Sequence, residues 1–468
     1  MAEMPERPFH AGEGIAVRAG HAHQTTAAGG ENTGTRKDVV APVTMEEVLR
    51  AKNVEKAKRR VKSNRGAPGV DGMTVDDLDE FLESETWEQI RKALLEGRYQ
   101  PQAVLGVEMP KPNGGIRQLG VPTVRDRLIQ QAILQEIQPY IDPTFSQHSY
   151  GFRPGRQAQT AVERMKDYVE AGYDWIVDCD LAKFFDEVQH DVLMARVARR
   201  IQDKRILRTI RRYLQAGMML GGVESQRLKG TPQGGPLSPL LSNILLDDLD
   251  RELERRGHRF ARYADDFIIC VKSRKAGERV LGSLEQFLEK KLRLKVNRDK
   301  SKVARANECA FLGYSVMFLK NGSVRLTTSR RSHRRLREKV RQVIAGRGRG
   351  QSILAVIQSL TPILRGWYNY YCLDELATSY GGTDGYVRRR LRWLYWRHWK
   401  TPKTRRKRLT ALGLSPEQAG RTAYSSCGPW RCSRIPGINQ ALPNRHFDNL
   451  GLFSLLQAHQ ERIIVTTV

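Results

Sequence analysis

Hydrophobic and polar positions follow two periods along this chain, and these periods predict where helices and strands lie. From Met45 to Val61, apolar residues recur at helical spacing. The glycines and the proline between Gly66 and Gly72 interrupt this pattern. From there to about residue 320, short β-rich runs alternate with amphipathic stretches, which predicts an α/β or α+β body. Residues 1–43 have no apolar period, so we expect a mobile extension there.

A helix is predicted to begin at Ser238, with Ser238 as its N-cap and Pro239 in its first turn. Its apolar face would consist of Leu240, Leu241, Ile244, Leu245, Leu249 and Leu253. Gln233 and the two glycines after it precede this helix and are predicted to form a turn. Glycine there lets the backbone approach a nucleotide or primer closely. The alternative is a plain turn with no binding role.

Acidic residues follow one predicted strand and join two others. Residues 175–180 are predicted to form a buried strand, with Asp178 and Asp180 on one face because side chains alternate along a strand. A lone aspartate at a strand end is usually a turn or cap residue. Two further strand-like runs flank Asp265 and Asp266, so these two acids are predicted to occupy the tip of a tight hairpin.

Such a group of acids suggests a metal site. Adjacent carboxylates repel each other unless a cation lies between them and the strand-end acid. Mg²⁺ prefers hard oxygen ligands and leaves positions for phosphates. Two such ions about 3.5 to 4 Å apart would activate an attacking oxygen and stabilise the leaving oxygen of a phosphoryl transfer. A solvated Asp-Asp turn explains the hairpin equally well when the hairpin is taken alone.

Two other features could recognise a nucleotide. Lys111 and Arg117 flank a hairpin signal, and in a loop with an odd number of residues they would face each other and could clamp a triphosphate. Solvated surface cations are the alternative. Phe185 lies five positions after Asp180, on the opposite side from Phe184 if the strand continues. Its ring could exclude the 2′-hydroxyl of a ribonucleotide, or it could belong to the core.

The composition indicates which class of partner the protein binds. The 468 residues include 79 Lys and Arg against 51 Asp and Glu, a formal net charge of +28 that favours a polyanion, with nucleic acid as the first candidate. A hydrophobic content of 40% excludes a disordered basic tail. No apolar run is long enough to span a membrane, and we expect an intracellular protein. The six cysteines include no C-x-x-C pair, which argues against a disulfide scaffold and a paired-cysteine zinc site.

The positive charge is concentrated in residues 321–410, which hold 22 Lys and Arg and only four Asp and Glu, a net charge of +18. Four of the seven tryptophans also lie there, and Trp393 and Trp396 fall on one helical face, so we expect the tryptophans to belong to a core. We expect the cations to contact RNA. The predicted RNA-binding residues are Arg388, Arg389, Arg390, Arg405, Arg406, Lys407 and Arg408.

An ordered set of motifs resembles one family. Residues 263–266, Tyr-Ala-Asp-Asp, resemble the signature of reverse transcriptases, and residues 180–186 precede it at the matching distance. Between them, residues 231–244 resemble the group II intron form of the fourth conserved block. Further matching stretches are Gly66 to Gly72, Lys111 to Pro122, Ser149 to Arg156, Leu294 to Lys300, and Phe311 to Tyr314. Residues 45–455 are therefore similar to bacterial group II intron reverse transcriptase/maturases, most of all to the compact class C type.

The resemblance implies an α+β right-hand polymerase, with fingers, a palm built on a ferredoxin-like antiparallel sheet, a helical thumb and a small basic C-terminal domain. The implied boundaries are an extension at 1–43, fingers and palm at 44–320, a basic helical thumb or maturase (X) domain at 321–410, and a DNA-binding region at 411–468. Because nothing after Cys432 supplies the cysteine pairs and histidines of an endonuclease module, DNA cleavage by this chain is not expected.

The resemblance also assigns roles to residues. The implied metal ligands are Asp180, Leu181, Asp265 and Asp266, of which the three aspartates are catalytic. The implied nucleotide-binding residues are Lys111, Arg117, Phe185, Gln233 and Lys300. The implied primer-template turn is Phe311, Leu312 and Gly313. Asp178 and Asp186 match no metal-ligand position and are interpreted as structural acids.

The implied function is that of an RNA-directed DNA polymerase that copies its intron RNA and assists splicing as a maturase. Its partners would be group II intron RNA, template RNA with a DNA primer, target DNA and dNTPs, with two Mg²⁺ ions, in the bacterial cytoplasm and at the nucleoid. Neither a membrane nor a particular oligomeric state is implied. The alternatives are a non-catalytic splicing factor and a reverse transcriptase of another bacterial system, for instance a defence system.

Overall fold

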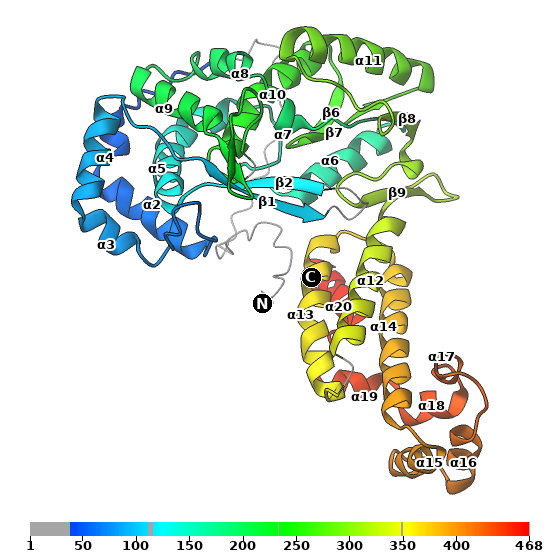
Figure 1. The fold of residues 1–468 in the computed structure, drawn as a ribbon. Coiled ribbons are helices and arrows are strands. Elements are labelled where there is room, and N and C mark those ends of the chain that lie inside the picture. The colour runs from blue at the N-terminus through cyan, green and yellow to red at the C-terminus, as the bar shows by residue number, and fades with distance from the viewer. Residues whose placement is uncertain (1–37, 111–115, 233, 348–349, 468) are drawn as a thin grey trace. The chain divides into compact units, whose positions relative to one another are not determined.

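The computed structural model describes residues 38–110, 116–232, 234–347 and 350–467, and it shows the predicted α+β architecture (Figure 1). Lys111, Gln233 and most of the predicted extension lie outside the described residues. No described helix is both long enough and apolar enough to cross a lipid bilayer.

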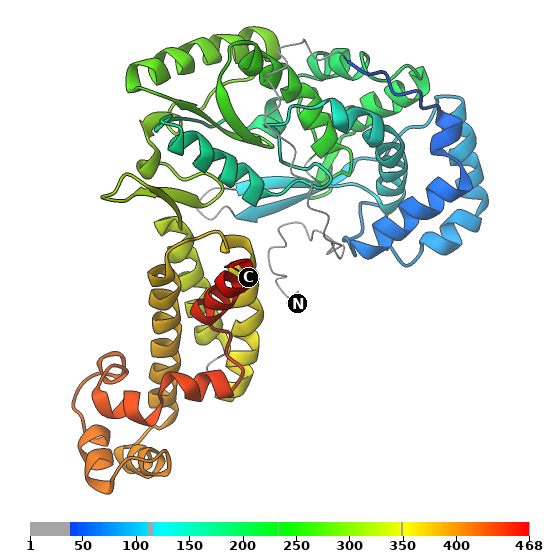
Figure 2. The same cartoon turned by 180° about the vertical axis from the view of Figure 1, so that it is seen from behind.

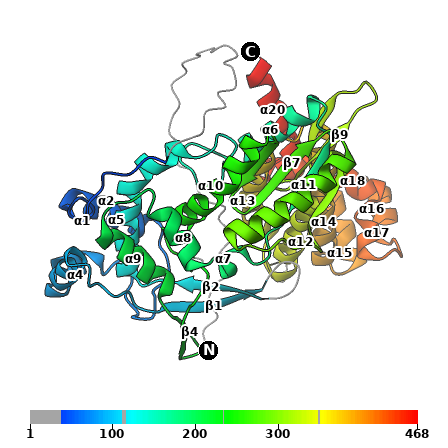
Figure 3. The same ribbon diagram turned by 90° about the horizontal axis from the view of Figure 1, so that it is seen from above.

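The acidic residues belong to a four-stranded antiparallel sheet with the order β6-β7-β3-β8. Its strands are β3 (Trp175–Cys179), β6 (Arg259–Tyr263), β7 (Asp266–Val271) and β8 (Lys302–Arg305). Alternation along β3 turns Val177 toward α11 (Arg274–Phe287), which covers the sheet in the view of Figure 3, and turns Ile176 toward α6 (Ala158–Glu170). Both faces of this sheet are therefore buried, and its acids lie where β3 ends and β7 begins.

A second sheet has the order β2-β1-β4-β5, in which only the β1–β4 pair is parallel. Its strands are β1 (Val104–Pro110), β2 (Ile116–Val121), β4 (Met218–Leu220) and β5 (Val223–Ser225). The helices before α6 are α1 (Met45–Val48), α2 (Ala51–Ser63), α3 (Leu78–Glu83), α4 (Glu85–Leu95) and α5 (Val124–Ile141). The predicted helical stretch from Met45 to Val61 is thus confirmed, with a break between α1 and α2.

Four helices follow β3 before the hairpin of the acidic sheet: α7 (Phe184–Glu187), α8 (His190–Val197), α9 (Lys204–Gln215) and α10 (Ser238–Arg255). All six predicted apolar residues of α10 are buried. The predicted N-cap of α10 is wrong, because Leu237 takes that position and Ser238 is already helical. The Ser238 hydroxyl instead donates to the Pro232 carbonyl at 2.7 Å, which closes the turn before the helix.

The ribbon of β9 (Tyr314–Phe318) and β10 (Val324–Thr328) leads into a helical region, seen from two sides in Figures 1 and 2. The long helices of this region are α12 (Arg330–Arg347), α13 (Ile353–Tyr371), α14 (Ala377–His398) and α20 (Leu455–Thr467). The short ones are α15 (Pro402–Ala411), α16 (Pro416–Ala423), α17 (Pro429–Cys432), α18 (Pro436–Ala441) and α19 (Asn444–Asn449). Short irregular helices also occur earlier in the chain, at Asp142–Thr144, Leu288–Leu292 and Ala306–Glu308.

One apolar core runs through this helical region from Leu336 to Leu455 and includes Trp396, which is only 1% exposed. Trp367 and Trp393 pack against the same core, as expected for the tryptophans. The core continues past residue 410, and residue 320 falls in the turn between β9 and β10. The helical region therefore begins at Arg330 and shares its core with the C-terminal helices.

Candidate active site

Asp180 follows the last residue of β3 and lies beside the start of β7. Cys179 pairs with Phe267 across these two strands, so the next position in register brings Asp180 opposite Asp266. The Asp180 amide donates to Ser301 Oγ at 3.0 Å, and its carbonyl accepts from the Asn297 amide at 2.8 Å. Directly opposed residues of an antiparallel pair point to the same face, so this edge of the sheet gathers the two carboxylates.

The hairpin that carries the other acids turns one residue earlier than predicted. Tyr263 pairs with Asp266, so Ala264 and Asp265 form a two-residue turn and Asp266 begins β7. Ala264 has a φ of 59°, in the left-handed region typical of such turns. The prediction that the acids occupy the tip therefore holds for Asp265 and is wrong for Asp266. Alanine in the left-handed position gave no turn signal, because glycine or asparagine is usual there.

Neighbouring acids raise the pKa of Asp266 and of Asp178. The pKa of Asp266 is raised to about 7, first by desolvation and then by the like charges of Asp178, Asp265 and Asp180. Its side chain is nevertheless exposed, so water and ions can reach it. Desolvation and the charge of Asp180 raise the pKa of Asp178 to about 6, while Lys302 opposes the shift. Asp178 thus belongs to this electrostatic group, and its place on the face of Asp180 was the sequence signal for it.

The donor set fits a hard divalent cation in its chemistry, because only oxygen ligands converge and they repel one another without a counter-charge. Among the described residues, no three acid, histidine or cysteine side chains already surround one point as a finished ligand set. The side chain of Leu181 is apolar and buried, so only its backbone carbonyl could serve as a ligand. Lys300 is one of the cations near these acids, with Nζ 3.7 Å from Asp180 Oδ2.

Arg262 lies fully buried behind the turn, and the sequence reasoning missed it. Its guanidinium donates at 2.5–3.0 Å to Asp250 Oδ1 and Oδ2, Asn243 Oδ1, Ser149 Oγ and the Ala264 carbonyl. A side chain at Gly151 would also collide with the Ala264 backbone. Arg262 therefore fixes the turn that bears Asp265 to helix α10. A charged residue among Phe260, Ala261 and Tyr263 was the signal that could have revealed it.

Phe185 does not lie on a strand, because β3 ends at Cys179 and Phe185 is part of helix α7. The expectation that the strand continues is wrong. The Phe185 ring is half-buried, with its centroid 5.1 Å from that of the buried Phe184 in an edge-to-face contact. Phe185 also lines a cavity of about 390 Å³, together with Gln118 and the segment 225–231. It is therefore neither a pure core residue nor a free surface residue.

Arg117 lies in β2 and pairs with Met109 of β1, and Ile116 pairs with Pro110. Lys111 lies outside the described residues, so the predicted opposition of the two cations stays a prediction. Gly234 lies close to this sheet, since a side chain there would collide with the Gly120 carbonyl.

Comparison with known proteins identifies the family. Residues 109–316 match the family model of the reverse transcriptase (RNA-dependent DNA polymerase), and residues 333–413 match that of the group II intron maturase-specific domain. Protein YkfC of Escherichia coli strain K12 is 35% identical over 302 residues, which cover 56% of this chain and 79% of YkfC. The chain belongs to the group II intron reverse transcriptase/maturase family.

A second relative of this reverse transcriptase is the group II intron-encoded protein LtrA of Lactococcus lactis subsp. cremoris. It is 29% identical over 335 residues, which cover 58% of this chain and 55% of LtrA, so the chain spans about half of LtrA. A solved partial Cas6-RT-Cas1–Cas2 complex matches 53% of this chain and 43% of its own, with 25% identity and a TM-score of 0.35. The family membership means that the chain is an RNA-directed DNA polymerase.

The predicted primer-template turn of the reverse transcriptase is fastened to its helical region. Phe311 is buried, and Leu312 and Gly313 have φ of 52° and 82°. The Tyr370 hydroxyl donates to the Leu312 carbonyl at 3.1 Å, and the Ser329 amide donates to the Gly313 carbonyl at 2.9 Å. The turn is thus held rigidly between the sheet domain and the helices α12 and α13.

The predicted RNA-binding cations fall into four groups. Arg388 is buried and forms an ion pair of 2.9 Å with Asp448, so it stabilises the core instead of facing RNA. Arg389 and Arg390 are half-buried beside Trp430. Arg405 stacks on Trp396, with Cζ 4.4 Å from the ring centroid. The remaining three, which are exposed on α15 as expected, are Arg406, Lys407 and Arg408.

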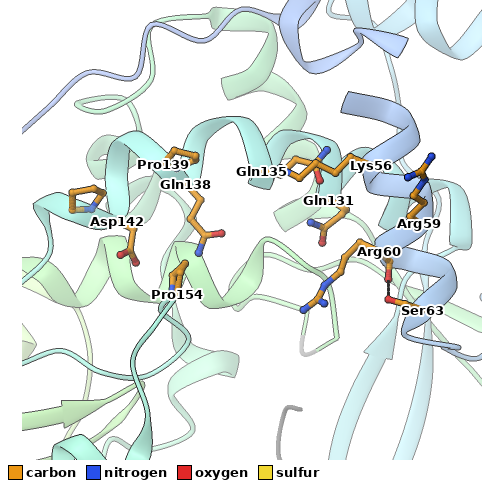
Figure 4. Close-up of a pocket in the computed structure, with 11 residues that line it drawn as sticks. Lys56, Arg59, Arg60, Ser63, Gln131, Gln135, Gln138, Pro139, Asp142 and Pro154 are labelled. Atoms are coloured by element: carbon orange, nitrogen blue, oxygen red, sulfur yellow. Dashed lines mark hydrogen bonds between the residues drawn. The ribbon is translucent and has the colours of Figure 1, made fainter. Parts of the chain in front are cut away.

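A cavity of about 710 Å³ lies between helices α2 and α5, and none of Asp180, Asp265 and Asp266 lines it (Figure 4). Lys56, Arg59 and Arg60 of α2 line one side. Gln131, Gln135 and Gln138 of α5 line the other at helical spacing. Arg59 is paired with Glu55 at 3.0 Å, and Gln135 donates to the Asn53 carbonyl at 2.6 Å, so part of this lining already serves the fold.

Proposed function

We propose that this reverse transcriptase copies its intron RNA into DNA at the edge of the sheet where β3 ends, with Asp180, Asp265 and Asp266 holding two Mg²⁺ ions. The observation that supports this best is the raised pKa of Asp266, to which Asp178, Asp265 and Asp180 contribute. When bound, the ions neutralise the acids, activate the attacking oxygen and stabilise the leaving oxygen. Arg262 holds the turn that carries Asp265, so Asp265 needs little rearrangement to bind an ion.

The neighbouring residues are proposed to position the nucleotide. Lys300 lies beside Asp180 and can meet a phosphate that approaches the acids. Phe185 lines a cavity with Gln118, and its ring is proposed to exclude the 2′-hydroxyl of a ribonucleotide. Lys111, Arg117 and Gln233 are proposed to bind the incoming dNTP, as they are matched by the family motifs. The Phe311–Gly313 turn would grip the primer strand through its fixed backbone.

We further propose that the basic region binds intron RNA and stabilises its folded form for splicing. Support comes from the net charge of residues 321–410 and from the exposed cations of α15. The proposed partners are then group II intron RNA, template RNA with a DNA primer, target DNA and dNTPs. The proposed place of action is the bacterial cytoplasm at the nucleoid.

Primer extension by the wild-type chain on poly(rA) with an oligo(dT) primer tests the catalytic proposal. We expect extension that rises with Mg²⁺ and stops when EDTA removes it. A chain that binds this template but never extends the primer would contradict the proposal and favour a non-catalytic splicing factor. A chain that extends efficiently but has no effect on any group II intron would favour a reverse transcriptase of another bacterial system.

A further inference from the structure

Two arginines of α14 lie over the ring of Trp430, where α17 lies against α14 (Figure 1), and Arg434 follows α17 in the sequence. The Cζ atoms of Arg389 and Arg390 lie 3.7 and 4.4 Å from the centroid of the Trp430 ring. Arg434 lies close enough that its charge, with that of Arg390, adds to desolvation in lowering the pKa of Arg389. We call these four residues the Trp430 cluster.

The positive charge of the Trp430 cluster is not neutralised within the described residues. No carboxylate in that part of the chain lies within ion-pair distance of Arg389, Arg390 or Arg434. Other arginines of α14 have internal partners: Arg388 pairs with Asp448, and Arg392 donates to the Leu442 carbonyl at 2.9 Å. Helix α14 therefore carries two kinds of arginine. Some stabilise the core, and others lack a counter-charge.

The guanidinium groups of the cluster are held in place but retain free donors. Arg389 donates to Ser433 Oγ at 3.3 Å and to the Trp430 carbonyl at 3.2 Å, and Arg390 Nε donates to Tyr386 Oη at 3.1 Å. Their other N–H groups have no acceptor among the described residues. Stacking on a ring fixes the planar guanidinium, so little conformational entropy is lost when it binds a ligand.

We propose that the Trp430 cluster is a binding site for the phosphodiester backbone of a nucleic acid. This rests on the proposed function, since the protein must bind RNA and DNA, and it adds a specific site to it. A planar guanidinium matches a phosphate with two parallel hydrogen bonds. A purely structural Arg–Trp stack would explain one arginine on the ring, but it gives no reason for three neighbouring cations without an acid. A bound phosphate removes their mutual repulsion.

Binding of the full-length chain to an RNA duplex and to a DNA duplex of the same sequence, measured over a range of KCl concentrations, tests the site. The variants are the double Arg389→Gln/Arg390→Gln and the single Arg434→Gln, which changes an exposed residue. The control is Arg421→Gln, which removes the same single charge as Arg434→Gln from an exposed arginine that already has a partner, Glu417, at 2.6 Å.

We expect the slope of log affinity against log salt to fall by about one for each phosphate contact removed, so by about one to two in the double variant. The control should keep the wild-type slope. A loss on both duplexes supports a site for the shared backbone, and a loss on one supports the proposal and shows which nucleic acid occupies it. Unchanged slopes on both duplexes overturn the proposal. If the double variant does not fold, Arg434→Gln decides in the same way.

Primer extension by the same preparations separates this proposal from the proposed function. If the wild type extends a primer and the slopes do not change, the Trp430 site is wrong and the proposed function stands. If the slopes fall but the wild type never extends a primer, the site stands and the proposed catalytic function is wrong.

Discussion

Asp266 is the residue at which assembling the proposed catalytic site opposes folding. Its pKa of about 7 in the folded protein exceeds the ordinary carboxyl value of 3.8, so the folded chain binds this proton more tightly than the unfolded chain. The stability that the proton contributes is fully present below pH 4 and is lost as the pH rises through 7. Without Mg²⁺, like charges then weaken the fold at neutral and higher pH.

Asp266→Asn should therefore stabilise the protein in EDTA, by about 1 kcal/mol at pH 8 once solvent screening of this exposed carboxylate is allowed for. The gain should shrink at pH 5, where the wild-type carboxyl is mostly protonated. Urea unfolding at the two pH values measures it. A variant that is equally destabilised at both would show that Asp266 supports the fold and does not oppose it.

Phe185→Ala should weaken discrimination against ribonucleotides, because it removes the ring that lines the cavity with Gln118 and the segment 225–231. Incorporation of dNTPs and rNTPs at matched concentrations measures the ratio of kcat/KM values, and we expect it to fall at least about 10-fold. Phe184→Leu, a change to the buried neighbour, is the control for disturbed packing. Unchanged discrimination in a folded Phe185→Ala variant would make the ring a packing residue only.

Arg262→Lys should lower kcat more than it raises the KM for dNTP, because lysine keeps the charge but cannot reach all the groups that the guanidinium joins. The variant should also lose about 1–3 kcal/mol of stability, since buried acceptors lose their donors. Steady-state kinetics and urea unfolding check both effects. Normal kcat in a destabilised variant would limit Arg262 to a structural role.

At the scale of elements, the sequence predicted what depends on periodicity. The alternation in residues 175–180 and the leucine spacing after Ser238 correctly indicated β3 and the buried face of α10. What failed depended on local turn geometry or on contacts between distant segments. The register of the β6–β7 hairpin moved the turn to Ala264, and Arg262 took its role from partners on α10 and a distant loop. The residue-level roles of the acids themselves stay predictions.

Helix α15 divides its cations between packing and solvent. Arg405 donates to the Trp399 carbonyl at 2.9 Å and stacks on Trp396, whereas Arg406, Lys407 and Arg408 are exposed. We expect Arg405→Ala to cost about 1 kcal/mol of stability through the lost stacking and hydrogen bond. Changing these last three cations to alanine should leave the stability unchanged and flatten the salt dependence of RNA affinity. The reverse pattern would contradict this division.

At the scale of the whole molecule, the two family matches fall on different parts of the chain. Residues 109–316 carry the acids, and residues 333–413 carry most of the concentrated positive charge. Polymerisation and RNA stabilisation should therefore be separable. Asp265→Asn should still promote splicing of its intron at low Mg²⁺, because the proposed splicing role is to stabilise the folded RNA. A splicing time course with wild type, Asp265→Asn and the α15 triple variant checks this, and failure of Asp265→Asn alone would link the two activities.

The most direct test of the account is primer extension by Asp265→Asn, compared with the wild type on poly(rA) and oligo(dT) at equal template occupancy. The turn that carries Asp265 is fixed by Arg262, so asparagine should fit while it removes the charge needed to hold Mg²⁺. We predict that extension falls roughly 100-fold or more, while template affinity and thermal stability stay at wild-type values. Near-normal extension by the folded variant would contradict the assignment of the catalytic site.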